Sequence, residues 1–445
     1  MRMPSNQPHY ILKQLEECLK KCYLLWRLAM LHKLIFSTLT LLLLCACSVA
    51  EPPADNSRNE TDVVVLVTES TNVLSATEVT ITQVKPLATV KPPPLPSPVP
   101  TVTTKANVPM EAIFFPANDE RFHYIGRFEF DNSDGPAFDW SGSAVEFSFV
   151  GTGLAIQLAD GRNSYNVAID DRREVLKTTI DSDVYVLAEE LDPGEHTVRI
   201  SKRTEAYVGA AVFKGTDITG DLLEKRSTAD RRIEFIGDSI TAGYGNEGDS
   251  PDCWFTPDTE NADLSYAVVT ADALDADYSL IALSGLGVVR NLRDDTAVSE
   301  QTAVDFIDRT LGLNPFIIWP PERNTPDAVV INLGTNDYSS APIPADEEFV
   351  AAYVELLQSI RDRYPDAFIF AIAGPLMLYP APRVIASAVA QFEAANHDQR
   401  VMVVEIEDNL QRSAEDFGCD WHPNISGHQK IAAQLIPAVA ETLGW

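Results

Sequence analysis

Basic residues are scarce in this sequence of 445 residues. Lys and Arg together number 34 against 65 Asp and Glu, which gives a formal net charge of −31. A charge of this sign repels nucleic acid and anionic lipid headgroups, so neither is expected as a partner. It does not repel a neutral polymer such as a polysaccharide. Solubility in a salty medium is a sufficient explanation of the charge. The charge therefore excludes polyanionic partners but does not identify the actual partner.

Cysteine and histidine are also scarce. Among six cysteines and seven histidines there is no HExxH motif and no zinc-ligand spacing in the folded body, so we expect no metal and no cofactor. Only Cys253 and Cys419 lie beyond an N-terminal export signal. In an oxidising compartment two such cysteines are able to pair, and the alternative is two unrelated buried thiols. The other four fall in or before the signal: Cys18, Cys22, Cys45 and Cys47.

The apolar run near the N-terminus, Leu34 to Leu44, is short. It is too short for a good spanning helix but suits the core of a signal peptide. It ends in Leu-Cys-Ala-Cys, which resembles a bacterial lipobox and would make Cys47 the lipidated first residue of the mature protein. We therefore expect a lipoprotein-type signal over residues 1–47, with Met30 as a possible true start, and export to the outer membrane or cell surface. The alternative is an ordinary cleaved signal or an N-terminal anchor. In that case the protein is secreted or periplasmic.

Three further segments follow the signal. Residues 48–107 are rich in Pro, Thr, Val and Ser and predict a semi-stiff, extended linker. Residues 108–227 hold short alternating strands with turn signals such as Gly151-Thr152-Gly153, which predict a β-sandwich or jelly roll. Residues 228–445 alternate apolar strands with helical stretches, which predicts an α/β fold with a parallel sheet covered by helices on both faces. With 45% hydrophobic residues, the chain is able to build substantial cores.

Three polar motifs follow expected strands of the second domain, where ligands of open parallel sheets bind, and a fourth comes just before the last expected helix. Ser239 follows a strand in a tight turn that exposes its hydroxyl, and the glycines of Ser-Gly-Leu-Gly at 284–287 let a backbone N–H approach a ligand. The side chain of Asn336 offers an N–H donor for an oxyanion. His422, before the last helix, is a natural base for a serine hydroxyl. Each motif alone also fits an ordinary turn or surface residue.

Together, in this order, the four motifs resemble the blocks of the GDSL/SGNH hydrolase superfamily, which implies a flavodoxin-like domain. The resemblance makes Ser239 the nucleophile and first oxyanion donor, Gly285 or Gly287 a backbone donor, Asn336 the third donor and His422 the general base. His428, inside the last helical pattern, is interpreted as structural.

One position departs from the superfamily. Its triad Asp usually stands three residues before the His, where this sequence has Cys419, and Asp420 stands two before. Either Asp420 reaches His422 through a different turn, or a backbone carbonyl orients the imidazole and the site is a Ser–His dyad. In the second case Asp420 contacts substrate or only the loop.

The two domains together resemble carbohydrate esterase family 2, on the stretches 124–156, 194–206, 251–267 and 417–432. The resemblance implies removal of acetyl groups from polysaccharides such as xylan and glucomannan, by a family in which the Ser–His dyad is known. Sugars stack on aromatic rings, so Trp421, Trp254 and Trp319 are candidate substrate contacts, with buried core as the alternative for each. A Cys253–Cys419 disulfide would pin two loops over the site.

Two other functions stay open. An SGNH esterase of the same chemistry would act on lipids, short-chain esters or envelope glycans. A surface lipoprotein would bind polysaccharide without turnover, although Ser239, Asn336 and His422 together argue against a pure binder. The sequence does not indicate the preferred polymer, the acetyl position or the oligomeric state.

Overall fold

The computed structural model describes residues 101–102, 111–225 and 230–445. The expected signal over residues 1–47, with Met30 and Cys47, lies outside the described residues, as does the linker apart from Thr101 and Val102. Within the described stretches, no helix has the length and apolar character needed to cross a membrane.

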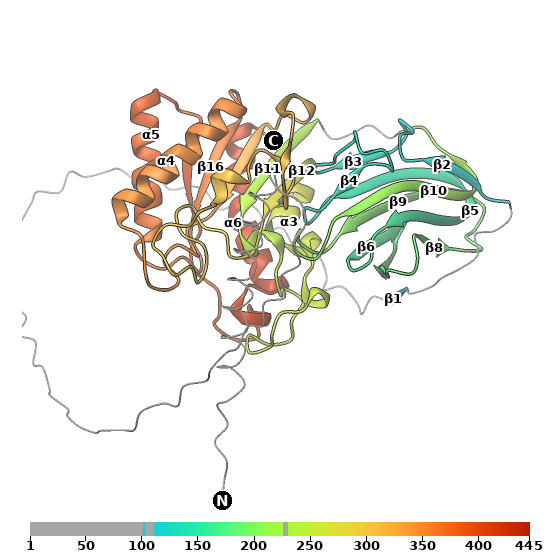
Figure 1. Cartoon of the computed structure of the whole chain (residues 1–445), viewed down its shortest axis with the longest axis horizontal. Coiled ribbons are helices and arrows are strands. Elements are labelled where there is room, and N and C mark those ends of the chain that lie inside the picture. The colour runs from blue at the N-terminus through green and yellow to red at the C-terminus, as the bar shows by residue number, and fades with distance from the viewer. Residues whose placement is uncertain (1–100, 103–110, 226–229) are drawn as a thin grey trace, which may run out of the picture. The chain divides into compact units, whose positions relative to one another are not determined.

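Residues 101–102 and 111–225 form an all-strand domain, seen at the right of Figure 1. Its strands pair in the order β1-β7-β6-β9-β5-β10-β2, with β3 and β8 also pairing with β5 and β4 with β10. Alternate residues point inward, as in β6, where Tyr165, Val167 and Ile169 join a core of aromatic and aliphatic side chains. The strands are β1 (Thr101–Val102), β2 (Ile113–Pro116), β3 (His123–Ile125), β4 (Ala137–Phe138), β5 (Ala144–Ala159), β6 (Ser164–Ile169), β7 (Arg172–Lys177), β8 (Val184–Ala188), β9 (Gly194–Lys202) and β10 (Ala211–Leu222).

Strand β5 differs from the sequence prediction. The glycines Gly151 and Gly153 predict a turn between two strands, but β5 runs unbroken through them over 16 residues. A Cβ at Gly151 would lie 2.3 Å from the carbonyl oxygen of Thr219 in β10. The prediction of a turn is wrong because glycine serves here for close approach of two strands, beside a register shift at Thr219 and Gly220.

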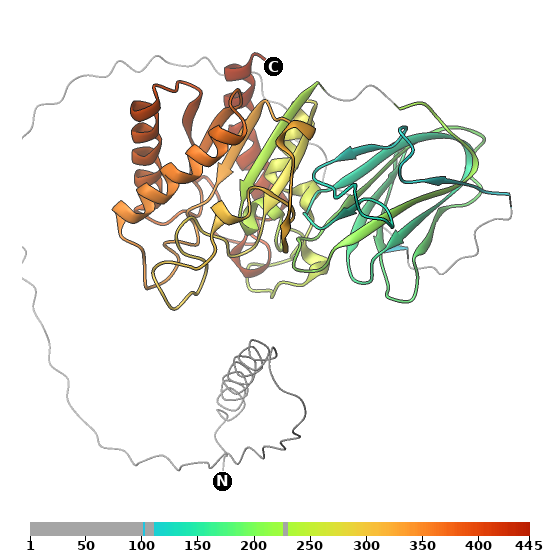
Figure 2. The same ribbon diagram turned by 45° about the horizontal axis from the view of Figure 1, so that its top comes forward.

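Residues 230–445 form a five-stranded parallel sheet in the order β12-β11-β15-β16-β17, with helices on both faces (Figure 2). The order is 2-1-3-4-5 along the chain, the flavodoxin-like arrangement. The strands are β11 (Arg231–Gly237), β12 (Ala276–Ala282), β15 (Ala328–Asn332), β16 (Phe368–Ala373) and β17 (Val401–Glu405), beside a hairpin of β13 (Arg309–Leu311) and β14 (Asn314–Ile318). The helices are α2 (Ser239–Ala242), α3 (Tyr266–Ala273), α4 (Asp346–Arg363), α5 (Ala381–Asn396) and α6 (Ile425–Leu443). The short 3₁₀ helices are η1 (Pro257–Thr259), η2 (Ala262–Leu264), η3 (Ala303–Asp305), η4 (Pro321–Arg323) and η5 (Cys419–Trp421).

Successive residues of the sheet strands face different helices. In β11, Ile236 packs in one core with α4 and α5, and Phe235 packs in another with α3 and α6. This pattern explains why the strands read as continuous apolar runs, since both faces of the sheet are covered.

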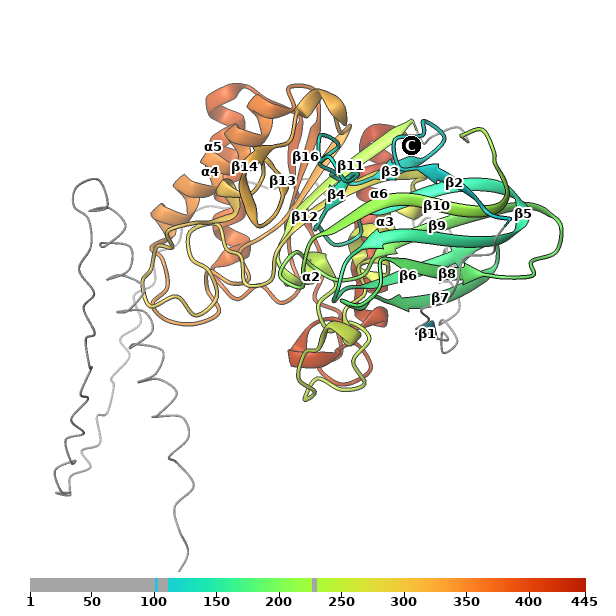
Figure 3. The same cartoon turned by 45° about the vertical axis from the view of Figure 1, so that its right-hand side comes forward.

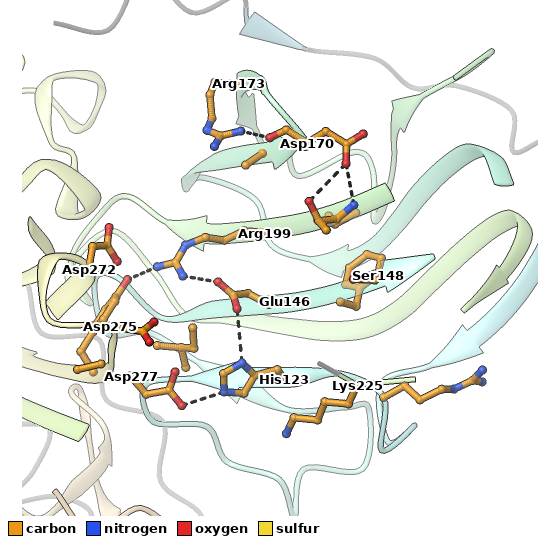
Figure 4. A pocket seen from close by; sticks show the side chains of 18 residues that line it. His123, Glu146, Ser148, Asp170, Arg173, Arg199, Lys225, Asp272, Asp275 and Asp277 are labelled. Carbon is orange, nitrogen blue, oxygen red and sulfur yellow. Dashed lines mark hydrogen bonds and ion pairs between the residues drawn. The ribbon is translucent and has the colours of Figure 1, made fainter. Parts of the chain in front are cut away.

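The strand domain and the α/β domain share polar contacts that are buried or partly buried. Arg127 Nη2 donates to Glu234 Oε2 of β11 over 2.7 Å, and its Nη1 donates to the carbonyl of Arg309 over 2.7 Å. Further along, His123 Nε2 lies 2.9 Å from Asp277 Oδ2 at the start of β12. His123 and Asp277 also line a mixed-charge pocket of about 490 Å³, to which residues of β5, β9 and the start of β12 contribute (Figure 4).

Candidate active site

The candidate nucleophile lies at the carboxyl end of β11, where α2 begins beside β12 (Figure 3). Asp238 caps α2, because its Oδ1 accepts the N–H of Ile240 over 3.0 Å. Gly237 has no room for a side chain, since a Cβ there would lie 2.0 Å from Thr241 Oγ1. The Gly-Asp-Ser motif is thus the local solution to a sharp strand-to-helix turn that presents Ser239, which is 7% exposed.

The structure brings His422 to this serine. His422 Nε2 lies 2.8 Å from Ser239 Oγ, and its Nδ1 lies 3.1 Å from the backbone carbonyl oxygen of Asp420. A carbonyl only accepts, so Nδ1 carries the proton and Nε2 is left to accept from the serine hydroxyl. Burial lowers the pKa of His422, which outweighs the opposing bond to Asp420. The imidazole is therefore neutral at pH 7, as a general base requires.

The carboxylate of Asp420 points away from the imidazole. It accepts the hydroxyl of Tyr244 over 2.9 Å and the N–H of Phe255 over 3.0 Å. The backbone of Asp420 is in the left-handed region, with a φ of 52°. In this conformation the carbonyl of Asp420 faces His422, and its side chain points away from His422. Of the two arrangements that the sequence leaves open, the geometry is that of a Ser–His dyad oriented by a backbone carbonyl.

The two glycine candidates for the oxyanion site differ in geometry. The N–H of Gly287 donates to Asn291 Oδ1 over 3.0 Å, and a Cβ there would lie 2.0 Å from the carbonyl oxygen of Arg290. The N–H of Gly285 has no acceptor among the described residues, and its φ is +82°. Gly285 is thus the available backbone donor, and Gly287 serves close packing of the loop.

Asn336 lies between the serine turn and the glycine loop. Its Nδ2 donates to Asp238 Oδ2 over 3.1 Å and to the carbonyl of Leu286 over 2.9 Å. Both amide protons therefore have acceptors, and an oxyanion would share or replace the bond to Leu286. The structure thus places the side chain of Asn336 between Asp238, next to the candidate nucleophile, and Leu286, next to the candidate glycine donors.

Sequence reasoning missed two supporting residues. Asp337 is fully buried and its Oδ1 accepts the N–H groups of Val289 and Arg290 over 2.7 and 2.9 Å, which fixes the loop after Gly287. A signal for Asp337 existed, since it directly follows Asn336 in the same motif. Tyr244, whose ring lies 4.3 Å from that of His422, follows Ser239 by five residues with nothing in the pattern to mark it.

The three tryptophans predicted to contact substrate differ in their exposure to solvent. Trp421 is 50% exposed and Trp254 is 83% exposed, so both are able to offer a face to a sugar. Trp319 is 2% exposed, beneath the guanidinium of Arg127, and its prediction as a substrate contact is wrong. It follows the β13–β14 hairpin, which is a separate two-stranded sheet, so the rule for the ends of parallel strands did not apply to it.

A disulfide joins Cys253 and Cys419, 166 residues apart in the chain. It connects the loop that carries Trp254 to η5, which leads into His422. His428 is fully buried and its Nδ1 accepts the N–H of Tyr266 over 3.1 Å, which is a structural role. In the described part of the chain, no group of three His, Cys, Asp or Glu side chains is arranged to hold a metal ion.

A serine paired with a histidine at the carboxyl edge of a flavodoxin-like sheet defines a serine hydrolase of the GDSL type. The model of the GDSL-like lipase/acylhydrolase family matches residues 235–430, and that of the carbohydrate esterase 2 N-terminal domain matches residues 124–225. A solved family two carbohydrate esterase from Clostridium thermocellum, in complex with cellohexaose, is 35% identical with a TM-score of 0.68, over 73% of this chain and 99% of that one. The chain belongs to carbohydrate esterase family 2.

Curated relatives agree with this family. The cellulase/esterase CelE of Acetivibrio thermocellus is 36% identical over 326 residues, which is 72% of this chain but only 39% of the relative. An acetylxylan esterase / glucomannan deacetylase of Cellvibrio japonicus is 29% identical over 69% of this chain and 86% of its own length.

Proposed function

We propose that this carbohydrate esterase removes O-acetyl groups from polysaccharides such as xylan or glucomannan by two-step acyl transfer. The observation that carries the proposal is the 2.8 Å contact between Ser239 Oγ and His422 Nε2, in a chain of this family. The names of the Cellvibrio relatives support the substrate class. Exposed Trp421 and Trp254 near the same loop give a sugar chain apolar faces on which to stack.

The first half of the reaction acylates the serine. His422 Nε2 takes the hydroxyl proton as Ser239 Oγ attacks the acetyl carbonyl carbon. The tetrahedral oxyanion faces the N–H groups of Ser239 and Gly285, with Asn336 beside them. The imidazolium then protonates the departing sugar oxygen, which leaves a free sugar hydroxyl and an acetyl-serine.

The second half releases acetate. His422 takes a proton from a water molecule, whose oxygen attacks the acetyl-serine carbonyl through the same oxyanion site. The proton returns to Ser239 Oγ as the ester bond breaks. The net change is hydrolysis of one acetyl ester by one water, with the enzyme restored.

The test is acetate release from acetylated xylan and acetylated glucomannan by the full chain, beside Ser239→Ala. A matched control is Ser182→Ala, in the turn between β7 and β8 of the strand domain. We expect release by the wild type and the control and none by Ser239→Ala. Polymer binding without release by the wild type would favour a binding lipoprotein. Cleavage of a small acetate ester but of neither polymer would favour an esterase of other substrates.

For location, we propose an exported lipoprotein anchored through Cys47, with the proline-rich stretch as spacer and a jelly-roll strand domain. The lipobox-like Leu-Cys-Ala-Cys end of the apolar run supports this. The measurement is incorporation of radiolabelled palmitate in a bacterial host. Label on the wild type that disappears in Cys47→Ser is the expected result, and equal label in both would contradict it.

A further inference from the structure

A buried carboxylate of the strand domain reaches the loop that carries the candidate oxyanion donor. Glu205, which follows β9, is 3% exposed, and its Oε2 accepts the backbone N–H of Ser284 over 2.7 Å. Ser284 comes directly before Gly285. The contact therefore joins two domains at the catalytic edge, 79 residues apart in the chain.

Besides its bond to Ser284, Glu205 has further hydrogen bonds through its backbone. Its backbone N–H donates to Glu260 Oε2 over 3.2 Å, and its carbonyl accepts from Lys202 Nζ over 3.1 Å. Burial raises the pKa of Glu205, and the bonds from Ser284 oppose this. Burial lowers the pKa of Lys202 to about 8, while nearby carboxylates oppose the change. These contacts hold the backbone of Glu205, and burial confines its side chain beside the N–H of Ser284.

The glycine loop depends on few anchors before Gly287. The N–H of Leu286 donates to the carbonyl of Leu283 over 3.2 Å, and the N–H of Leu292 donates to the carbonyl of Gly285 over 2.8 Å. Glu205 supplies the anchor on Ser284. The next peptide unit presents the N–H of Gly285, whose direction follows from how Ser284 is fixed. A donor to an oxyanion has to be in place before the charge develops.

We propose that Glu205 is a positioning residue that sets the direction of the Gly285 N–H toward the oxyanion. The strand domain then contributes directly to catalysis by the α/β domain. The proposal rests on the serine esterase chemistry above and adds a residue from outside the hydrolase domain. Its effect falls on the transition state, because the ground-state carbonyl carries little charge for Gly285 to stabilise.

The experiment compares Glu205→Met with Glu205→Gln in the full chain, using 4-nitrophenyl acetate as substrate. Met keeps the volume and removes the acceptor, whereas the Gln amide oxygen still accepts from Ser284. We expect Glu205→Met to lower kcat about 10- to 100-fold with KM changed less than about twofold, since a misplaced oxyanion donor acts mainly on the transition state. Glu205→Gln should keep kcat within about threefold of the wild type.

The matched control is Glu234→Gln, another buried carboxylate at the contact of the two domains, which touches Arg127 and no catalytic loop. We expect it to lower the unfolding temperature and leave kcat unchanged. Wild-type kcat in Glu205→Met would overturn the proposal. If Glu205→Met fails to fold, Glu205→Gln decides, because a tenfold or larger loss of kcat with the acceptor retained would also overturn it. A wild type that does not cleave the ester would instead refute the proposed function.

Discussion

Two of the contacts between the strand domain and the α/β domain differ in what they reach. At the catalytic edge, the loop contact consists of Glu205 and the backbone N–H of Ser284. Along the strands, the strand contact consists of Arg127 with Glu234 in the middle of β11 and of His123 with Asp277 at the start of β12. The loop contact ends on backbone next to a candidate oxyanion donor, and the strand contact ends on side chains of the sheet. We infer that the first sets site geometry and that the second is one of the contacts that hold the domains together.

The largest expected effect is a loss of kcat in a variant that leaves both the loop contact and the strand contact intact. Ser239→Ala should lower kcat at least about 10³-fold, because it removes the nucleophile and no other group replaces it. Stability should stay within about 0.5 kcal/mol of the wild type. Initial rates on 4-nitrophenyl acetate and a urea unfolding curve measure the two quantities. A variant that retains a tenth of the activity would show that the reacting serine lies elsewhere.

The second prediction separates the strand contact from catalysis. Arg127→Met leaves the carboxylate of Glu234 buried without its cation, so we expect a loss of about 3–5 kcal/mol in the free energy of unfolding. In the folded fraction, kcat should remain unchanged. Replacing both partners by Met should recover much of the stability, since no buried charge is left unpaired. Equal losses of kcat from Arg127→Met and Glu205→Met would remove the difference between the two contacts.

The same comparison shows what the sequence could predict. The candidate serine lies in a short motif directly after a strand, because the residues that make the tight turn there, such as Gly237, are fixed by local sterics, and the candidate histidine lies in a short motif just before the last helix. The parallel sheet follows from apolar strands covered on both faces. Local sequence carries these features, and their order along the chain gives the family.

Features that depend on long-range packing did not follow from the pattern. The role of Glu205 needs a neighbour 79 residues away, and its own surroundings in the sequence give no sign of burial. Trp319 lies in a loop, as expected, but it is buried under Arg127, which comes from the other domain. The orientation of Asp420 depends on a left-handed backbone angle at a non-glycine residue, which composition does not predict.

A third prediction concerns the catalytic edge alone. Asp420→Asn should lower kcat no more than about tenfold, because the carbonyl of residue 420 orients His422 in either case. In a triad, the corresponding change costs about 10⁴-fold. The measurement is kcat across pH 5–9. A loss near 10⁴-fold would mean that the carboxylate turns to the imidazole during the reaction, contrary to its bonds with Tyr244 and Phe255.

The smallest effect is a pH dependence of stability from the strand contact. Burial lowers the pKa of His123, but its hydrogen bonds to Asp277 and Glu146 outweigh burial and raise the pKa overall. A raised pKa means that the folded protein binds the proton more tightly than the unfolded chain, whose histidines titrate near pH 6.5. The contribution to stability is therefore complete below about pH 6.5 and is lost as the pH rises through the folded pKa.

The ion pair of His123 with Glu146 is partly exposed, and Arg199 also binds Glu146 and so competes with His123 for the carboxylate charge (Figure 4). We therefore expect a contribution of no more than about 1 kcal/mol. The measurement compares the unfolding free energies of the wild type and His123→Gln at pH 6 and pH 8. The difference between the two proteins should be larger at pH 6, with kcat alike in both. A larger difference at pH 8 would reverse the sign of the linkage, and a change in kcat would mean that the strand contact also reaches the site.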